Sequence, residues 1–319
     1  MTIHYLNRDE LNGIPDLEPL IDGVLDKGTV AMLVAQPAAG KSFLAVDWVC
    51  HYATNAEAWQ ARKISRNVTY PDDKPVDEGK VLYIAAEGVR GMKKRVQAWE
   101  QTWRRTVAPD RLTVVPHAIQ LGNTNAVAEL CHDLQQETYG LVVIDTLARC
   151  AMGLEENSST EMGRVVHAAY QIRDAMGPDG TVLLIHHLSK AGTIRGSSAL
   201  LGGVDQVMIL TRSGDALKLE DEKRKDGAEL EPMNLRLKSV HGSLIVEAGR
   251  DDDPGHNPLV QEMAQLSHLL PLSKNELRMA TSLPESAFFH ALNRGLKSGQ
   301  IVSTQDKTPK YRLSTQGNV

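Results

Sequence analysis

Short apolar runs alternate with longer helix-like segments over the first 200 residues of the chain. The runs are apolar almost throughout, which is typical of strands buried on both faces of a sheet. They cover Thr29–Ala35, Lys80–Ala85, Leu112–Pro116, Leu141–Asp145 and Thr181–His186. Between them the spacing predicts helices over Phe43–Ala58, Met92–Trp103, Asn125–Glu137 and Glu161–Met176. This alternation predicts an α/β core with a doubly wound, mostly parallel sheet.

After Gly203 the pattern changes to strands without intervening helices. The predicted strands are Gln206–Thr211, Ala216–Leu219, Asn234–Lys238 and Leu244–Glu247. Because short connections join antiparallel neighbours, these strands predict an antiparallel extension of the sheet. The polar stretch Arg62–Gly79, which contains two prolines, is interpreted as a long surface loop.

The last 60 residues differ from the rest in charge. From Gln261 to Val319 seven Lys or Arg face four acidic residues, a net charge of +3, so the first 260 residues carry −8 of the total of −5. The change follows an Asp, Pro and Gly cluster at Arg250–Pro258. We therefore predict a core over residues 1–250, a linker over 251–258 and a small domain over 259–319.

The small domain has the pattern of a winged helix. Helices are predicted over Ser273–Ala280 and Glu285–Ser298, and the runs IVST and YRLS around a turn predict a two-stranded wing. Helix, turn, helix and wing resemble a DNA-binding module. Phe288, Ala291, Leu292 and Leu296 are expected in its core. The outward positions include Arg294 and Lys297, our candidates for DNA contact, although such modules also dock proteins.

Composition narrows the class of protein. The 319 residues are 42% hydrophobic and 24% charged, as in ordinary globular proteins. Three cysteines, far apart, offer neither a disulfide framework nor a paired metal site, which favours a reducing cytoplasm. No apolar run reaches about 18 residues and no basic, apolar leader is evident, so neither membrane spanning nor secretion is expected.

The run VAQPAAGKSFLAVDWV contains the chain's most specific motif. A buried strand enters a tight loop that ends Gly40, Lys41, Ser42, and a helix follows directly. In this context backbone N–H groups and the helix N-terminus hold phosphates, the lysine pairs with the β- and γ-phosphates of ATP, and the serine ligates Mg²⁺. The cofactor-binding candidates are Gln36, Pro37, Ala38, Ala39, Gly40, Lys41, Ser42 and Phe43. Ala35 replaces the usual first glycine, from which we expect a stiffer loop.

Two acidic residues follow other buried strands. Asp145 ends the run LVVID, where its carboxylate is a candidate Mg²⁺ ligand, although such a residue can also cap a turn. Glu87 follows VLYIAA and is the candidate that orients the attacking water. Both lie at the edge where parallel α/β sheets bind ligands.

Two histidines leave the strand VLLIHH side by side. Alternation sends His186 and His187 to opposite faces. We expect His187 to contact a γ-phosphate or the attacking water, and His186 to bond a backbone carbonyl as a structural residue.

Together QPAAGKS, Glu87, Asp145, the two histidines and RGSSAL at Arg195–Leu200 resemble the RecA and DnaB-like motor family, in particular hexameric replicative helicases of the plasmid RepA type. The resemblance covers roughly Leu17–Val246. It implies a RecA-like fold, ATP hydrolysis between subunits of a homo-oligomeric ring, Glu87 as general base, and action on single-stranded DNA.

The resemblance gives three further segments a meaning. Leu147–Thr160 and Ser189–Arg195 correspond to loops that line the channel of such rings, although a plain solvated surface loop is the alternative for both and is favoured for the first. The first is acidic and resembles a mobile lid more than a DNA grip, and the second carries the candidates Lys190 and Arg195 for DNA contact. In Leu219–Glu229, Lys223 and Lys225 resemble the cations that reach the neighbouring subunit's γ-phosphate, although a charged hairpin tip in water has the same pattern.

The sequence therefore predicts an ATP-driven motor on DNA, a helicase or translocase. Two other classes remain open at this point. One is a nucleotide-switched DNA-binding loader or recombination protein that turns over slowly, and the other is a small-molecule phosphotransferase.

Overall fold

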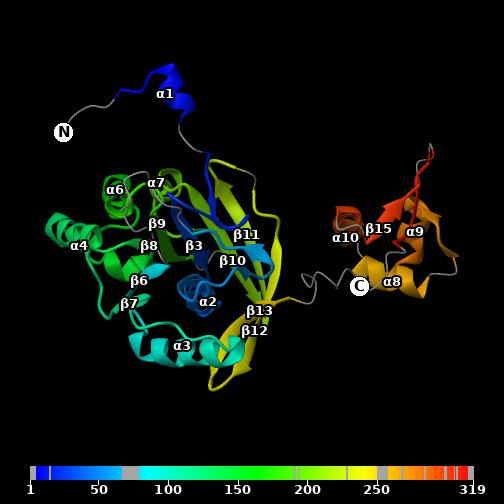
Figure 1. The fold of residues 1–319 in the computed structure, drawn as a ribbon, viewed down its shortest axis with the longest axis horizontal. Coiled ribbons are helices and arrows are strands. Elements are labelled where there is room, and N and C mark those ends of the chain that lie inside the picture. Colours follow the sequence, from blue (N-terminus) through cyan, green and yellow to red (C-terminus); the bar gives the residue numbers. More distant parts are fainter. Residues whose placement is uncertain are drawn as a thin grey trace. The chain divides into compact units, whose positions relative to one another are not determined.

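The computed structural model is built around a nine-stranded sheet (Figure 1). It describes residues 5–13, 16–66, 79–189, 192, 194–227, 229–249, 258–266, 269–283, 285–297, 300–304, 306 and 308–314. The chain divides into two compact units, residues 1–247 and 248–319. Among the described residues, no helix combines the length and the apolar character needed to cross a membrane.

Six neighbouring strands of the large sheet run parallel, and three more extend it beyond β10. The order is β13-β12-β11-β10-β3-β9-β8-β6-β7. The parallel strands are β3 (Val30–Ala35), β6 (Lys80–Ala85), β7 (Leu112–Val115), β8 (Tyr139–Asp145), β9 (Thr181–His187) and β10 (Gln206–Ser213). The extension consists of β11 (Ala216–Arg224), β12 (Met233–Val240) and β13 (Ser243–Ala248), and β10–β11 and β11–β12 are antiparallel. This confirms the predicted α/β fold class.

Helices cover both faces of the sheet, so the parallel strands are buried on both sides. One face packs against α2 (Lys41–Ala53) and α3 (Val89–Trp103). The other packs against α4 (Thr124–Gln136), α5 (Leu147–Cys150), α6 (Ser159–Ala175) and α7 (Ser198–Gly203). Successive residues of β3 alternate between these two cores, which explains why the strand is apolar throughout.

The first core helix is shorter than predicted. α2 begins at Lys41 but ends at Ala53, because Asn55 takes a left-handed backbone with φ of 54°. The chain then returns in a hairpin, where the Trp59 indole donates to Asp47 across 2.6 Å. The prediction of helix up to Ala58 is therefore wrong. Short elements here and before β3 are α1 (Arg8–Asn12), β1 (Pro19–Ile21), β2 (Leu25–Asp26), β4 (Ala58–Trp59) and β5 (Arg62–Lys63).

The second unit consists of three helices and a small sheet. Its elements are α8 (Pro258–Gln265), β14 (Leu272–Ser273), α9 (Lys274–Ala280), α10 (Glu285–Lys297), β15 (Ile301–Ser303) and β16 (Lys310–Leu313), with strand order β14-β16-β15. Phe288, Ala291 and Leu292 are buried in its core, and Leu296 packs against them, as predicted. The sequence did not predict α8. Of the predicted linker, only Pro258 lies within the described residues.

A buried ion-pair network closes the end of the sheet opposite to the strand carboxyl ends. β11 continues to Arg224, past the predicted end at Leu219. The Arg224 guanidinium lies 2.7 Å from Asp26 and 2.9 Å from Asp221, and its side chain is only 4% exposed. Burial raises the pKa of Asp26, while the guanidinium opposes that shift. The segment that looked like a solvated charged tip is thus partly a structural cluster.

Removing this arginine should destabilise the core strongly. Arg224→Ala leaves two buried carboxylates without their cation, and we expect the free energy of unfolding to fall by about 3–5 kcal/mol. Urea unfolding followed by circular dichroism measures the change. Lys218→Ala removes the exposed pair with Glu220 and should cost less than about 1 kcal/mol. Equal losses in the two variants would contradict a structural role for Arg224.

Candidate nucleotide site

The loop between β3 and α2 forms the framework of the site. Ala38 and Gly40 both take left-handed backbone, with φ of 62° and 105°, whereas Ala35 does not, so alanine at position 35 is unstrained. A φ of 105° at Gly40 favours glycine, and a Cβ there would lie 3.1 Å from the Leu237 side chain, which would have to shift. Gly40 caps α2 without a side-chain hydrogen bond, and the first turn of α2 has no acidic residue. The helix N-terminus is therefore open to an anion.

Lys41 lies folded inside this loop. Its ammonium donates to the carbonyls of Ala35 and Gln36 across 3.0 and 2.9 Å, and lies 3.2 Å from Nδ1 of His187. Burial lowers the pKa of Lys41 to about 8, while Asp145 and Glu87 oppose the shift. The loop thus holds a poorly solvated cation that gains from an arriving phosphate.

The two histidines contact different parts of the chain. His186 is buried, and its Nε2 lies 2.9 Å from the carbonyl of Arg195, which confirms its backbone contact. The other ring, His187, faces the loop lysine. Burial and the nearby Lys41 charge both lower the pKa of His187, so the neutral ring accepts a hydrogen bond from the ammonium.

Asp145 ends β8 with one oxygen fixed and one unused. Its Oδ2 accepts a 2.6 Å hydrogen bond from the buried Tyr83 hydroxyl. Its Oδ1 is buried and has no hydrogen-bond partner among the described residues. An unused carboxylate oxygen next to a phosphate loop fits a hard cation such as Mg²⁺, which takes few protein ligands and completes its shell with phosphate and water oxygens. The hydroxyl-bearing Ser42, half-buried in the first turn of α2, fits the same ion.

Glu87 lies in the turn after β6, the strand next to β8, and is in contact with solvent. Its backbone N–H donates to the carbonyl of Asp145 across 3.3 Å, and its side chain is 46% exposed. The Arg149 guanidinium in α5 lies 3.9 Å from this carboxylate. A base that must reach water needs such access, and Arg149 is a neighbour that the sequence analysis missed.

Arg212 is a second residue that the sequence did not indicate. It lies at the end of β10, and its guanidinium donates to the carbonyl of Ala38 across 2.9 Å. Its contact closes the outer side of the phosphate loop. Nothing in the local sequence pattern distinguishes it from other strand-end arginines.

The candidate DNA loops are tied to each other rather than free. Arg195 lies 2.5 Å from Glu156, an acidic residue of the preceding loop, and Ser197 N–H donates to the carbonyl of Glu156. Gln36 of the phosphate loop donates to the carbonyl of Ser189 across 2.8 Å. Lys190 lies outside the described residues, as do the side chains of Arg294 and Lys297 in α10.

Lys223 and Lys225 lie away from their own chain's phosphate loop. β11 pairs antiparallel with β10, placing Lys223 opposite Val207 at the amino end of the parallel strands. Its ammonium donates to the carbonyls of Leu201, Gly202 and Val204, and these three contacts cap the C-terminal end of α7. Lys225 is 62% exposed and lies 3.7 Å from Asp205. Of the two, Lys225 is the more exposed.

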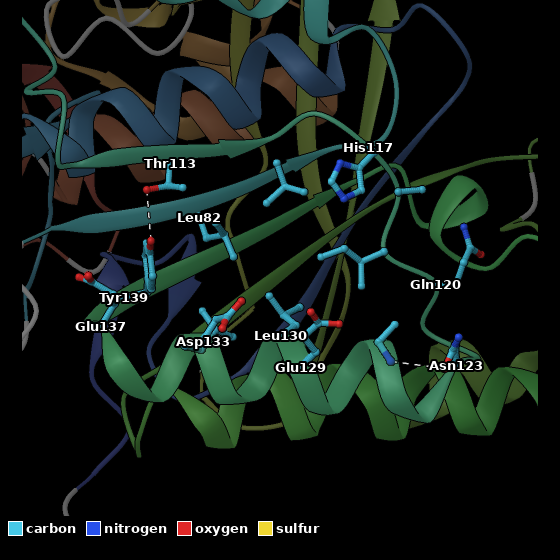
Figure 2. Close-up of a pocket in the computed structure, with 15 residues that line it drawn as sticks. Leu82, Thr113, His117, Gln120, Asn123, Glu129, Leu130, Asp133, Glu137 and Tyr139 are labelled. Carbon is cyan, nitrogen blue, oxygen red and sulfur yellow. Dashed lines mark hydrogen bonds between the residues drawn. The ribbon is translucent and has the colours of Figure 1, made fainter.

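A separate groove lies between the sheet edge at β7 and α4. It measures about 550 Å³, and Figure 2 shows Glu129 and Asp133 of α4 directed toward it. Its floor is apolar, with Leu82 and Leu130. Acidic walls repel a polyphosphate, so this groove does not compete with the loop as a nucleotide site.

Comparisons with known proteins identify one family and several solved structures with a similar fold. A family model described as an AAA domain matches residues 4–193. No curated protein matches the chain. The ATPase domain of G40P has a similar fold at 15% identity, covering 68% of this chain and 84% of that one, with a TM-score of 0.48. A KaiC-like protein from the archaeon Pyrococcus horikoshii OT3 is 13% identical, and the match covers 72% of this chain and 96% of that one. The RadB recombinase is 14% identical, and the match covers 69% of this chain and 90% of that one. Both structures have a TM-score of 0.47.

The lysine in the loop makes nucleotide binding dependent on pH. The free ammonium loses its proton near pH 8, and a bound phosphate restores the charged form. Affinity is therefore full below pH 8 and falls by up to ~10-fold per pH unit above it. Calorimetry at pH 9 in two buffers of different ionisation enthalpy should show uptake of about one proton per nucleotide, against almost none at pH 7. Identical heats in both buffers at pH 9 would contradict the assignment.

Proposed function

This chain belongs to the AAA domain family, whose model matches more than half of its length, and from that premise we propose that it is an ATP-hydrolysing motor on single-stranded DNA. One observation carries the proposal. The Lys41 ammonium lies in a phosphate-type loop beside His187, and Asp145 with its unused Oδ1 ends the strand next to β9. The Lys41 cation, the Asp145 carboxylate that can bind a metal ion and the solvent-accessible Glu87 carboxylate thus lie at one edge of the sheet.

In the proposed complex, the loop from Gln36 to Phe43 wraps the phosphates of ATP. Backbone N–H groups at the start of α2 donate to phosphate oxygens, and Lys41 leaves its two loop carbonyls to pair with the β- and γ-phosphates. Ser42 and Asp145 hold Mg²⁺. When bound, the ion offsets negative charge on the phosphate oxygens.

Glu87 is the proposed general base. Its carboxylate accepts a proton from a water whose oxygen bonds to the γ-phosphorus, while the bond from that phosphorus to the bridging oxygen breaks and ADP leaves. The exposure of Glu87 supports this role, since a fully buried carboxylate could not reach bulk water. His187, neutral and in contact with Lys41, is proposed to sense the γ-phosphate.

The motor is proposed to work as a homo-oligomer, a hexameric ring in the manner of the RepA-type helicases that the motifs resemble. Lys225, exposed at the opposite end of the sheet from its own loop, supports a role in completing a neighbour's site. Lys223 has the same proposed role, although its ammonium already bonds three carbonyls. Lys190 and Arg195 are the proposed DNA contacts of the core, and Arg294 and Lys297 those of the winged-helix-like unit.

A slow, ATP-switched loader is the second candidate, and one observation favours it. Arg149 lies 3.9 Å from Glu87 and Arg195 is paired with Glu156, so the base and one DNA cation are both engaged in the chain as it stands. Directional unwinding of a forked duplex distinguishes the motor from the loader. Assembly on DNA with ATP but without unwinding would favour the loader.

Two substitutions should separate binding from hydrolysis. Lys41→Ala removes the loop cation, so we expect loss of ATP binding as well as turnover. Glu87→Gln keeps the shape of the side chain but loses the base, so binding should persist while the hydrolysis rate falls by about 10²- to 10⁴-fold. Fluorescent-nucleotide binding and phosphate release, each with and without single-stranded DNA, measure both effects. Normal hydrolysis by the Glu87→Gln protein would rule out the proposed base.

The oligomeric site should complement between damaged subunits. A Lys225→Ala subunit keeps its own loop, and a Lys41→Ala subunit keeps Lys225, so a mixture contains interfaces with both groups intact. We expect each parent to be inactive and the mixture to recover part of the hydrolysis rate. Lys223→Ala is tested separately, and its melting temperature is measured as well, because the Lys223 ammonium also caps the C-terminal end of α7 and its loss can destabilise the chain. If mass measurement shows that the two variants assemble together but the mixture stays inactive, Lys225 is excluded as the cation donated to the neighbouring site.

A further inference from the structure

The solvent face of α3 is basic in its first two turns and carries neutral amide side chains in the second half. Its exposed positions lie within about 100° of the helix circumference, at 3.6 residues per turn. They carry no acidic or apolar side chain. The exposed residues of α3 are Arg90, Lys93, Lys94, Gln97 and Gln101, and the exposed Arg104 follows as the C-terminal cap of the helix. We call this surface the α3 face.

This concentration of charge contrasts with the rest of the chain. From Val89 to Arg105 there are six Lys or Arg against a single acid, in a chain whose net charge is −5. That acid, Glu100, accepts a hydrogen bond from the N–H of Val107. The α3 face is therefore a local positive region on an acidic protein.

The two lysines of this face have no partner among the residues that the structure describes. Elsewhere basic side chains are paired, for example Lys80 with Glu137 and Arg195 with Glu156. Across the part of the chain that the structure describes, neither Lys93 nor Lys94 forms an ion pair or a hydrogen bond.

Positive charge continues beyond the end of α3. Burial, and then repulsion from Arg111 and Arg105, lowers the pKa of Arg66. Arg105 and Arg111 therefore each lie close enough to Arg66 to repel its charge. At the other end, Gly88 caps α3 without a side-chain bond and the first turn has no acid, so backbone N–H groups add to the field.

The α3 face is joined rigidly to the candidate nucleotide site. Trp99 of α3 donates to the buried Asp47 of α2 across 2.9 Å. The Arg95 guanidinium stacks 4.8 Å from the ring centre of Phe43, in the first turn of α2. Glu87, the proposed base, lies two residues before α3 begins. An anion on this helix is thus close in structure to the groups that act on ATP.

We propose that the α3 face binds the sugar-phosphate backbone of single-stranded nucleic acid. Fifteen residues span about 22 Å, which suits a linear polyanion better than a single phosphate. The exposed positions offer charge and amide groups but no aromatic or aliphatic side chain, so they fit backbone contact without base stacking or insertion into a membrane. This surface adds to the proposed function and rests on it, because the motor's nucleic-acid partner is what it would hold.

The test removes two charges from the α3 face and, in a matched control, two charges elsewhere on the core. Lys93→Ala with Lys94→Ala is compared with Arg164→Ala with Lys218→Ala, which are exposed on α6 and β11. Fluorescence anisotropy with a labelled oligothymidylate is measured in the full chain between about 50 and 200 mM salt. We expect the slope of log affinity against log salt to fall by about 1.4 in the first variant, since each lost phosphate contact removes about 0.7. The control pair should keep the wild-type slope.

Several outcomes would overturn the proposal. A wild-type slope in the Lys93 and Lys94 variant, or an equal loss in both variants, would exclude a specific surface. A smaller assembly mass with unchanged oligonucleotide binding would assign the face to contact with another copy of the chain. If the wild-type chain binds no oligonucleotide, both the face and the nucleic-acid partner fail. ATP hydrolysis by the wild-type chain, measured without oligonucleotide, decides separately whether the ATPase part of the proposed function holds.

Discussion

The arrangement of the site depends on keeping one buried cation charged. Lys41 is only 5% exposed, and a charged side chain that is so poorly hydrated needs close partners. The carbonyls of Ala35 and Gln36 supply them, because the left-handed backbone at Ala38 and Gly40 turns the chain back around the side chain. The carboxylates of Asp145 and Glu87 add negative charge nearby and oppose the fall in the pKa of Lys41. The same partners mark the positions that phosphate and a metal ion can take over.

The sheet order follows from this requirement. β6, β8 and β9 lie side by side next to β3, and all four are parallel, so the residues at their carboxyl ends meet at one edge. The N–H of Glu87 bonds the carbonyl of Asp145, which fixes the two acidic residues relative to each other. Tyr83 then holds one oxygen of Asp145 and leaves the other unused. Burial of Tyr83 strongly raises the pKa of its hydroxyl, so this hydroxyl remains protonated and donates the hydrogen bond.

The parallel core could be predicted from sequence because burial on both faces makes each strand an unbroken apolar run. Such runs identify the strands even when their order in the sheet is unknown. Residues at strand ends could be assigned to one edge for the same reason. The rest depends on distant partners. Arg224 lies in a charged segment typical of a solvated turn, yet it is buried because Asp26, 198 residues away in sequence, accepts its hydrogen bond. Arg212 and Arg149 owe their contacts to chain crossings that local spacing does not encode, and α2 ends early because Asn55 turns the chain.

The two helical layers of the core differ in charge, and this difference orients a polyanion. α4 presents Glu129 and Asp133 at its groove, whereas α3, on the opposite face of the sheet, presents Lys93 and Lys94. A phosphate chain is repelled by the first surface and attracted by the second, which selects the side bearing α2 and the phosphate loop. On that side Asp47 is fully buried and bonds both Trp59 and Trp99, so α2 and α3 share a polar contact that is costly to break. This contact couples the position of α3 to that of α2, and the layer that carries the phosphate-type loop is also the layer with the exposed positive charges of Lys93 and Lys94.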